Sequence, residues 1–533
     1  MDSTQKIAFV GAIGKSERES VTIADNDKRS AGTSIVLTSA PAFVFLFLRL
    51  CLAANRLLAQ QDSRAFSVVD FGARGDGTTL NTTAIQRTVD TCSESGGVVV
   101  VPPGIFLTGS IEMKSNVELY LQKGATILGS SRLSDYTKHR PQLRSYNDSF
   151  LRHSLFYAER QSNIAIKGEG VIDGQGEQFK VISKEKPARY KNRPYLIRFV
   201  ECTEVKIEDI TLQRRACWTQ QYLACENLII HGIRVYSHAN KNNDMMDIDG
   251  CRNVVISDCI GDTYDDGITL KSTSERITEN VTITNCVLSS HCNARKTGTE
   301  STGGFRNIVI SNIVVKPSEA DSMITGKRGR VHYEGAPTPP VGTVKNISLS
   351  DIIAKNVKST GCSITGIPNH SLENIALRNI RISFAGGVSA KSNETPKELE
   401  DQYPESTMWG QLPAYGFYIR HVKGLSMSDV DLTYEREDAR PALVLNDVAD
   451  AKISGFSPMA SSQAEATIIL EKVNTVIISG SSVKTPTLNL IRLTGERSAG
   501  ISIIGNDLRN VKNLCPPAED LEDILFSSSN RMR

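Results

Sequence analysis

Four segments between residues 227 and 315 decide the fold: NLIIHGIRV (227–235), NVVISDCIG (253–261), NVTITNCVL (280–288) and NIVISNIVV (307–315). Their starts are 26, 27 and 27 residues apart, and each alternates apolar and polar side chains before a turn residue. Period-two alternation is typical of a strand, and a fixed repeat in the twenties is typical of stacked coils. These segments therefore predict a parallel β-helix with one repeat per coil.

Related segments extend this pattern in both directions, with starts at 163, 204, 346, 374, 424, 475 and 500. The leucine skeleton of leucine-rich repeats is missing, and a propeller blade needs a repeat of about 40 residues or more. The prediction is an all-β solenoid that occupies residues 64–533 as a single domain. Wider gaps between repeats place loop insertions at 316–345 and 385–420.

An asparagine precedes the strand in most repeats, at positions 227, 253, 280, 307, 346 and 374. Asparagine tolerates the left-handed backbone of a tight corner, and its amide can bond the equivalent amide of the next coil. We therefore expect these residues to form a structural ladder at a coil corner, with no part in chemistry.

The first folded residues, from Phe66, predict a cap for the solenoid. A helix is expected over residues 82–93, with Asn81 as its N-cap and a buried stripe of Ala84, Ile85, Val89 and Cys92. Terminal coils of a solenoid need covering, because their open edge otherwise exposes the core. A short N-terminal capping helix meets that need.

Composition narrows the classes of partner. The net charge is +2 and the sequence has no basic block, so a nucleic-acid partner is not expected. A local cationic cleft for an acidic polymer remains compatible with this charge. Eleven cysteines occur without a CxxC pair, so no zinc site is expected. Disulfides and buried stacked thiols both remain open.

Residues 1–60 differ from the rest of the chain and are interpreted as a leader. The run from Ile35 to Ala54 is strongly apolar, follows Lys28 and Arg29, and ends in small residues. This pattern is typical of a secretory signal peptide, and a membrane anchor is the alternative. Either way, the remainder is expected outside the cytoplasm, secreted or periplasmic, with membrane contact only if the leader is uncleaved.

Three carboxylates, Asp244, Asp265 and Asp266, are separated by 21 and 22 residues, close to one coil. They are therefore expected on one face of neighbouring coils, where mutual repulsion raises at least one pKa. One protonated and one ionised carboxyl group is what glycoside hydrolysis requires. A calcium site or a solvated acidic edge is the alternative from spacing alone.

Long ordered motifs extend from Phe66 to about Asn510: FSVVDFGARGDG, VPPGIFLTGSIEMKSNVELYL, GEGVIDGQG, Trp218-Thr219, NNDMMDIDGC, DTYDDGITLKS and KTGTES. In these motifs the chain resembles glycoside hydrolase family 28, the polygalacturonases and related pectin hydrolases. The resemblance implies a right-handed parallel β-helix. It also implies an enzyme that hydrolyses α-glycosidic bonds of galacturonan or rhamnogalacturonan with inversion and without a metal or other cofactor.

The resemblance also implies roles for residues of the central motifs. Asp265 corresponds to the general acid, and Asp244 and Asp266 correspond to the residues that position and deprotonate the water. Asn242 belongs to the same Asn-x-Asp motif. Asp247 corresponds to a residue that orients the site or a sugar hydroxyl, with a plain strand residue as the alternative.

Two departures from the family pattern concern substrate binding. Asn293 stands where many members have the histidine of Gly-His-Gly, with His291 as a nearby substitute, and Lys296 is a candidate partner for a uronate carboxylate. The region expected to contain Arg-Ile-Lys has no such triplet. Lys327 and Arg328 are candidates to supply that charge, with an exposed basic turn as the alternative.

These departures favour a bacterial-type, exo-acting or rhamnogalacturonan-directed member over a plain endo-polygalacturonase. The insertions at 316–345 and 385–420 would lie beside the cleft and close one end of it. A polysaccharide lyase and a non-catalytic glycan-binding β-helix are the competing functions. The expected partner is a pectic polysaccharide, and the expected oligomeric state is a monomer.

Overall fold

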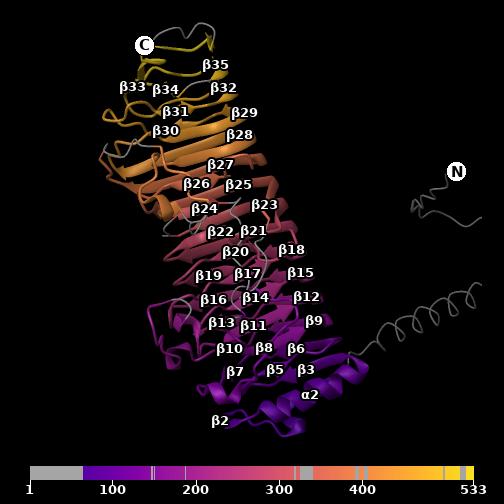
Figure 1. The fold of residues 1–533 in the computed structure, drawn as a ribbon. Coiled ribbons are helices and arrows are strands. Elements are labelled where there is room, and N and C mark those ends of the chain that lie inside the picture. The colour runs from indigo at the N-terminus through magenta and orange to yellow at the C-terminus, as the bar shows by residue number, and fades with distance from the viewer. Residues whose placement is uncertain are drawn as a thin grey trace, which may run out of the picture. The chain divides into compact units, whose positions relative to one another are not determined.

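The repeated segments form parallel strands that stack coil upon coil in the computed structural model (Figure 1). The structure describes residues 64–145, 148, 150–185, 188–316, 320–324, 340–389, 395–400, 406–495, 498–516 and 524–532. One coil contains β14 (Gln220–Leu223), β15 (Glu226–His231) and β16 (Arg234–Ser237), and the next contains β17 (Met246–Asp249), β18 (Arg252–Ser257) and β19 (Ile260–Thr263). Each strand pairs in parallel with its equivalent. The parallel β-helix prediction is confirmed.

The first strand of each coil belongs to what we call the site sheet. Its members are β5 (Ile111–Glu112), β8 (Ser154–Glu159), β11 (Tyr195–Val200), β14, β17, β20 (Ile268–Ser272), β22 (Asn293–Ser301), β24 (Ala320–Ile324) and β26 (Cys362–Thr365). The sheet continues through the first residues of β28 (Phe417–Arg436) and β29 (Leu443–Ser454) to β31 (Ile468–Glu471) and β34 (Ile491–Thr494).

Two further sheets complete the coils. The second sheet contains β1 (Ala65–Ser67), β3 (Gly97–Val101), β6 (Val117–Leu121), β9 (Ser162–Gly168), β12 (Thr203–Glu208), β15 and β18. The third sheet contains β2 (Asp76–Leu80), β4 (Gly104–Thr108), β7 (Ala125–Gly129), β10 (Val171–Asp173), β13 (Thr211–Gln213), β16 and β19. In the coils that follow, up to residue 386, one long strand spans both sheets: β21 (Thr278–Ser290) pairs with β18 and with β19. The strands that follow are β23 (Gly304–Val315), β25 (Thr343–Val357), β27 (Leu372–Gly386), β30 (Ser457–Pro458), β32 (Asn474–Ser479), β35 (Ala499–Ile504) and β37 (Leu525–Ser528), with β33 (Thr487–Asn489) and β36 (Val511–Asn513) as a separate pair.

The core is built by stacking equivalent apolar residues inside the coils. Leu228, Val254, Val281, Ile308 and Ile347 follow one another in register along the second sheet, and all are buried. Burying one such side chain contributes about 1.5–3 kcal/mol relative to leaving it exposed. Alternation with period two therefore directs one face of each strand inward and leaves the other face free for polar residues.

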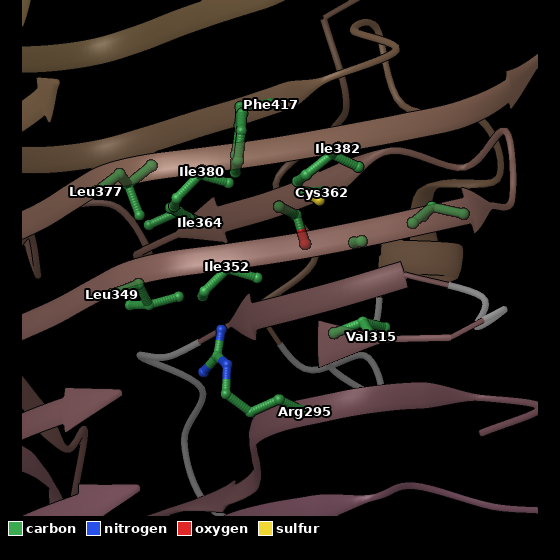
Figure 2. A pocket seen from close by; sticks show the side chains of 13 residues that line it. Arg295, Val315, Leu349, Ile352, Cys362, Ile364, Leu377, Ile380, Ile382 and Phe417 are labelled. Carbon is green, nitrogen blue, oxygen red and sulfur yellow. The ribbon is translucent and has the colours of Figure 1, made fainter. Parts of the chain in front are cut away.

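A small interior cavity of about 30 Å³ lies among the later coils, and Arg295 points toward it from β22 (Figure 2). Its lining is otherwise almost wholly apolar and includes Leu349, Ile352 and Ile364. Arg295 is in register with the buried Ile268, so the alternation of β22 turns it toward the core. This cavity belongs to the solenoid interior and is separate from the polar outer face of the site sheet.

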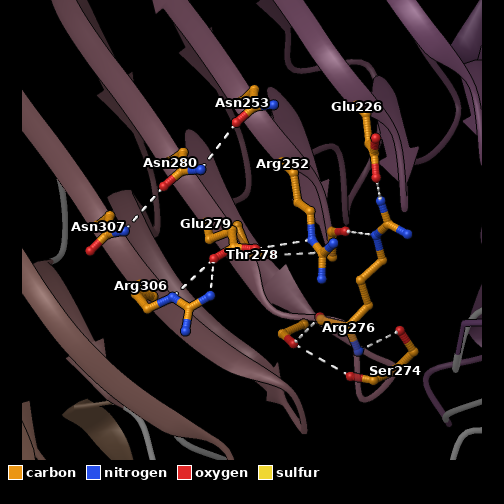
Figure 3. A network of polar contacts seen from close by, with 12 residues as sticks. Glu226, Arg252, Asn253, Ser274, Arg276, Thr278, Glu279, Asn280, Arg306 and Asn307 are labelled. Atoms are coloured by element: carbon orange, nitrogen blue, oxygen red, sulfur yellow. Dashed lines mark hydrogen bonds and ion pairs between the residues drawn. The ribbon is translucent and has the colours of Figure 1, made fainter. Parts of the chain in front are cut away.

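The asparagine ladder lies on the outside of the second sheet (Figure 3). Asn227, Asn253, Asn280 and Asn307 all have φ between 55° and 56°. The Nδ2 of each residue donates to the Oδ1 of the preceding one at 2.9–3.1 Å, and Asn346 and Asn374 continue the row at 3.0 Å. The prediction of a structural corner is confirmed.

The capping helix is α2 (Thr82–Ser95), which covers the first coils with Ile85, Val89 and Cys92 buried. Asn81 occupies the N-cap position but makes no side-chain capping bond. Its Oδ1 instead accepts from the amide of Arg74 at 2.7 Å, so it ties the preceding loop to the helix. The helix and its N-cap residue are therefore confirmed, although the Asn81 side chain bonds the preceding loop and not the helix.

Eight of the ten described cysteines are buried. Cys202, Cys225 and Cys251 lie just before equivalent strands of successive coils, as the stacked-thiol interpretation predicts. No helix within the described ranges is long and apolar enough to cross a membrane. The predicted leader, residues 1–60, lies outside the described residues.

Candidate active site

Asp244 and Asp266 occupy equivalent positions in adjacent coils, each just before a strand of the site sheet. The amide of Met245 donates to the carbonyl of Asp266 at 2.8 Å, and the amide of Gly267 donates to the carbonyl of Asn293 at 2.8 Å. Neighbouring strands are about 4.8 Å apart, so this stacking brings the carboxylates of different repeats together. The offset of 21–22 residues therefore corresponds to one coil.

Asp244 is buried, and its carboxylate is held from two sides. The indole Nε1 of Trp218 donates to Oδ2 at 3.0 Å, and Lys271 Nζ lies 3.8 Å from the same oxygen. Burial raises the pKa of Asp244 well above its ordinary value, and the nearby charges of Asp247 and Asp265 raise it further. The protonated form of Asp244 is thus favoured more than in an exposed aspartate.

Asp247 projects from the outer face of β17 and forms the centre of a buried ion-pair group. Its Oδ1 lies 2.8 Å from Lys271 Nζ. Burial raises the pKa of Asp247, while Lys271 opposes that change. Burial alone lowers the pKa of Lys271, but Asp247, Glu300 and Asp244 together raise it well above its ordinary value. Lys271 is therefore charged and shared among three carboxyl groups.

A register shift between β20 and β22 brings Glu300 into this group. Leu270 pairs with Thr297, whereas Ser272 pairs with Ser301, so β22 uses more residues than β20 over the same distance. Gly298 has φ of 104° at this point, a left-handed conformation that glycine adopts without steric cost. The KTGTES motif therefore encodes a bulge beside the ion pairs.

Asp266 is also buried, yet its environment favours the ionised form. Its Oδ2 lies 3.1 Å from Lys296 Nζ, and its Oδ1 accepts from the Nδ2 and the backbone amide of Asn293 at 2.8 and 3.2 Å. Burial by itself raises the pKa of Asp266, but Lys296 and Asn293 bring it below its ordinary value. Asp244 and Asp266 thus have pKa values shifted in opposite directions within one cluster.

Asp265 is the more accessible member of the adjacent pair, being half-buried. Its Oδ2 accepts from Asn242 Nδ2 at 3.2 Å, and its Oδ1 accepts from the amide of Asp266 at 3.0 Å. Asn242 is itself oriented by Arg193, whose Nη2 donates to Asn242 Oδ1 at 3.1 Å. Asp265 therefore presents a carboxyl group toward solvent from a fixed position.

One mixed donor group lies within this cluster. A ligand atom from each of Asp265, Asp266 and Cys292 lies within 4.8 Å of the others. Calcium takes about six to eight oxygen ligands. A set of two carboxylates and one thiol is a poor match for the calcium site that a lyase of this fold would use.

The family model for glycosyl hydrolases family 28 matches residues 92–366, more than half of the chain. This chain belongs to glycosyl hydrolase family 28. The three aspartates lie within the matched region, and the family assignment makes the protein a glycosidase. The resemblance inferred from the motifs is thereby confirmed.

Relatives of the family 28 chain are named for the same kind of activity. The "Probable polygalacturonase" of Vitis vinifera is 28% identical over 426 residues, which cover 67% of this chain and 85% of that protein. The "Exo-poly-alpha-D-galacturonosidase" of Dickeya chrysanthemi is 28% identical over 251 residues, 38% of this chain and 41% of that protein. The family 28 exopolygalacturonase structure of Yersinia enterocolitica superposes with a TM-score of 0.59 at 19% identity, covering 79% of this chain and 78% of that one. That likeness shows a shared fold.

The substrate-binding residues predicted from the sequence differ in where they lie relative to the aspartates of this family 28 site. Asn242 and Asn293 bond Asp265 and Asp266, and Lys296 is buried against Asp266 and does not face an open cleft. His291 is exposed and packs its ring against His238 and Tyr264, with centroids 5.1 and 5.2 Å apart. Lys327 and Arg328 lie outside the described residues.

Several supporting residues escaped the sequence prediction. Lys271 ends the DTYDDGITLK motif, Glu300 lies in KTGTES, and Arg193 precedes β11. Asn243 accepts from the amide of Asp265 at 3.2 Å and donates to Ser237 Oγ at 3.0 Å. Lys271 takes a polar position of the alternating segment Ile268-Thr269-Leu270-Lys271, as an exposed lysine would, so the sequence carried no signal of its burial. Arg193 lies between repeats, so no pattern points to it.

Proposed function

We propose that this glycosidase hydrolyses α-glycosidic bonds of a pectic polysaccharide, galacturonan or rhamnogalacturonan, with inversion at the anomeric carbon. The names of the family 28 relatives support the substrate class. The observation that carries the chemistry is the adjacent pair of Asp265 and Asp266. Asp266 is buried and is held in its ionised form by Lys296 and Asn293, as a base requires, while the half-buried Asp265 can reach the leaving oxygen.

In the proposed reaction, Asp265 acts as the general acid. Its proton passes to the glycosidic oxygen as the bond from that oxygen to the anomeric carbon breaks. Asp266, which Lys296 keeps ionised, takes a proton from the water that attacks the opposite face of the sugar, and Asp244 orients that water. Asp265 ends the step ionised and Asp266 protonated, and exchange with solvent restores both groups.

The spacing of the adjacent pair bears on where the water binds. Oxygens of Asp265 and Asp266 lie within 4.8 Å of each other, closer than the roughly 6.5–9.5 Å found between the carboxyl groups of most inverting glycosidases. This close approach favours a water bound to one side of the pair. We place it between Asp266 and Asp244, on adjacent coils, with Asp265 free to reach the leaving oxygen.

Other predicted residues take supporting roles in this proposal. Asn242 holds Asp265, Asn293 and Lys296 hold Asp266, and Asp247 holds Lys271 beside Asp244. His291 offers an exposed ring to a sugar. Lys327 and Arg328 stay predictions as substrate contacts.

We further propose that the enzyme releases sugars from a chain end. The described part of the 385–420 insertion packs on the site sheet beyond the carboxylates. Trp409 contacts Tyr418 edge-on with centroids 5.9 Å apart, and Arg420 Nη1 donates to the carbonyl of Pro396 at 2.6 Å. This segment would block that end of the site sheet, so that a polymer could be bound only by one of its chain ends.

Export from the cytoplasm is part of the same proposal, because pectic polymers are extracellular. The apolar run from Ile35 to Ala54 supports it as a signal peptide. A secreted, monomeric enzyme is the expected form.

The test is digestion of galacturonan and rhamnogalacturonan side by side, with Asp265→Asn as the catalytic control. We expect wild-type protein to release reducing sugar from at least one polymer and Asp265→Asn to lose about 10²–10⁴-fold, the usual contribution of general acid catalysis. Asp258→Asn, on the outer surface, is the matched control. Products absorbing in the ultraviolet would instead indicate a lyase, and early mid-size oligomers would contradict attack at chain ends.

A further inference from the structure

An open groove of about 610 Å³ lies beside Asp265 on the side of the earlier coils. It is enclosed by the segment before β11 and by the loops that precede β17 and β20. Its lining residues are Val181, Ile182, Ser183, Lys184, Arg189, His238, Asn240, Lys241 and Tyr264. Lys241 is the chain neighbour of Asn242, which bonds Asp265, and Tyr264 is the chain neighbour of Asp265 itself. Two lining residues are therefore direct chain neighbours of the proposed acid and of the asparagine that holds it.

The charge of this groove is entirely positive. Lys184, Arg189 and Lys241 line it, and no carboxylate is among the lining residues. Within the described ranges, the charged groups of these three side chains have no ion-pair partner, and the buried Nε of Arg189 has no hydrogen-bond partner. Lys271 and Lys296 in the carboxylate cluster are, by contrast, both paired with aspartates.

The backbone segments that carry Arg189 and Lys241 are anchored beside the carboxylate cluster. Arg189 lies in the short helix η5 (Ala188–Tyr190), and the buried ring of Tyr190 packs 5.1 Å from Trp218, which donates to Asp244. The carbonyl of Lys241 accepts from Arg193 Nη1 at 2.6 Å. A ligand held by Arg189 and Lys241 would therefore have a defined position relative to the aspartates.

One wall of the groove is aromatic. The rings of Tyr236 and His238 lie 5.1 Å apart, His238 and His291 lie 5.1 Å apart, and His291 and Tyr264 lie 5.2 Å apart. Tyr236 is 57% exposed. His238 and Tyr264 line the groove, and neighbouring rings of this row are tilted by 50–57° to one another, so each ring separately offers a surface for the apolar face of a pyranose next to donors suited to an anion.

We propose that this groove is the subsite for an acidic sugar next to the cleaved linkage, and that Arg189, Lys184 and Lys241 bind its carboxylate. The proposal rests on the proposed function. In this subsite the substrate carboxylate is bound by residues before β11 and β17. The sequence resemblance instead places carboxylate binding near residue 327. Arginine matches a carboxylate in two-point geometry, and the lysines add charge from either side.

Binding of short galacturonate oligomers to the Asp265→Asn protein tests the subsite without turnover. Calorimetry compares the free acid with its methyl ester, which has the same sugar but no charge. We expect the acid to bind at least about tenfold more tightly at low salt, because charge-assisted hydrogen bonds are lost in the ester. Adding Arg189→Met and Lys241→Met is expected to remove this preference, and Arg189→Lys is expected to keep part of it.

A preference for the acid that survives both added substitutions would overturn the subsite, as would equal binding of acid and ester by the parent protein. Lys206→Met on the outer face of β12 is the matched control for removing a lysine, and circular dichroism checks that each variant is folded. If wild-type protein cleaves neither polymer but the acid preference depends on Arg189, the proposed function fails while the subsite stands.

Discussion

Lys296 Nζ lies 3.1 Å from Asp266 Oδ2, and both side chains are almost completely buried. On the adjacent coils Lys271 bridges Asp247 at 2.8 Å and Asp244 at 3.8 Å. Each lysine therefore neutralises a different part of the carboxylate cluster. This division explains how the pKa values of Asp244 and Asp266 move in opposite directions only one coil apart.

Lys296→Met is expected to shift the pH dependence of activity. With Lys296 absent, burial is opposed by the hydrogen bonds from Asn293 but no longer by a positive charge, so the pKa of Asp266 rises and the ionised base forms at higher pH. The acidic limb of the kcat/KM profile should move to higher pH, and removal of one partner from a buried pair should cost about 3–5 kcal/mol of stability. A pH–rate profile and urea unfolding measure the two effects, with Lys206→Met as the control.

The pH dependence of this stability loss has a definite sign. A lowered folded-state pKa contributes stability above the unfolded-state pKa, and that contribution is lost as pH falls through the folded value. The difference between wild type and Lys296→Met should therefore be largest near neutral pH and should narrow in acid as Asp266 becomes protonated. A difference that stays constant from neutral to acid pH would contradict this account of Asp266.

Asp244→Asn is expected to lower activity while raising stability near neutral pH. The raised pKa of Asp244 means that the folded protein retains a proton that the unfolded chain releases, so stability falls as pH rises between the two pKa values. The amide avoids that cost and still accepts from Trp218. Activity should fall by about 10²-fold or more, while the urea midpoint near neutral pH should exceed that of wild type.

The gain in the Asp244→Asn variant should vanish below about pH 4, where an unfolded aspartate is also protonated. Asp258→Asn, at an exposed position, should change neither activity nor midpoint. A midpoint of Asp244→Asn below that of wild type at neutral pH would show that Asp244 is a structural anion, and would remove it from the proposed role.

The scaffold and the carboxylates could be predicted from the sequence because both recur at the spacing of one coil. Asn253 and Asn280 recur at the coil spacing, and Asp244 and Asp266 share that spacing, so a repeat is enough to align them. The partners of the aspartates are not periodic. Lys271 already lies between Asp247 and Asp244, and the bulge at Gly298 adds Glu300 as a third carboxyl group. Arg189 lies in a segment between repeats, where no pattern relates it to the site.

The stereochemistry of cleavage tests the proposed position of the water. An attack from the face opposite the leaving oxygen converts an α linkage into a β product, which then equilibrates slowly. Proton NMR of a fresh digest should therefore show the β anomer first and the α anomer later. Initial release of the α anomer would mean that the close pair of Asp265 and Asp266 works with retention, as its short spacing permits.

The asparagine ladder gives a prediction for the scaffold alone. Asn280 has φ of 56°, and it bonds Asn253 and Asn307 on either side. Asn280→Ala loses both bonds and places a Cβ-bearing residue in the left-handed region without local compensation, which should cost about 1–2 kcal/mol. Asn280→Gly loses the same bonds but accepts the backbone freely, so its urea midpoint should lie between those of Asn280→Ala and wild type. Both variants should keep wild-type kcat/KM, because Asn280 lies in the second-sheet part of β21 and outside the site sheet. Equal midpoints for the two variants would show that the ladder acts through its hydrogen bonds and not through its backbone conformation.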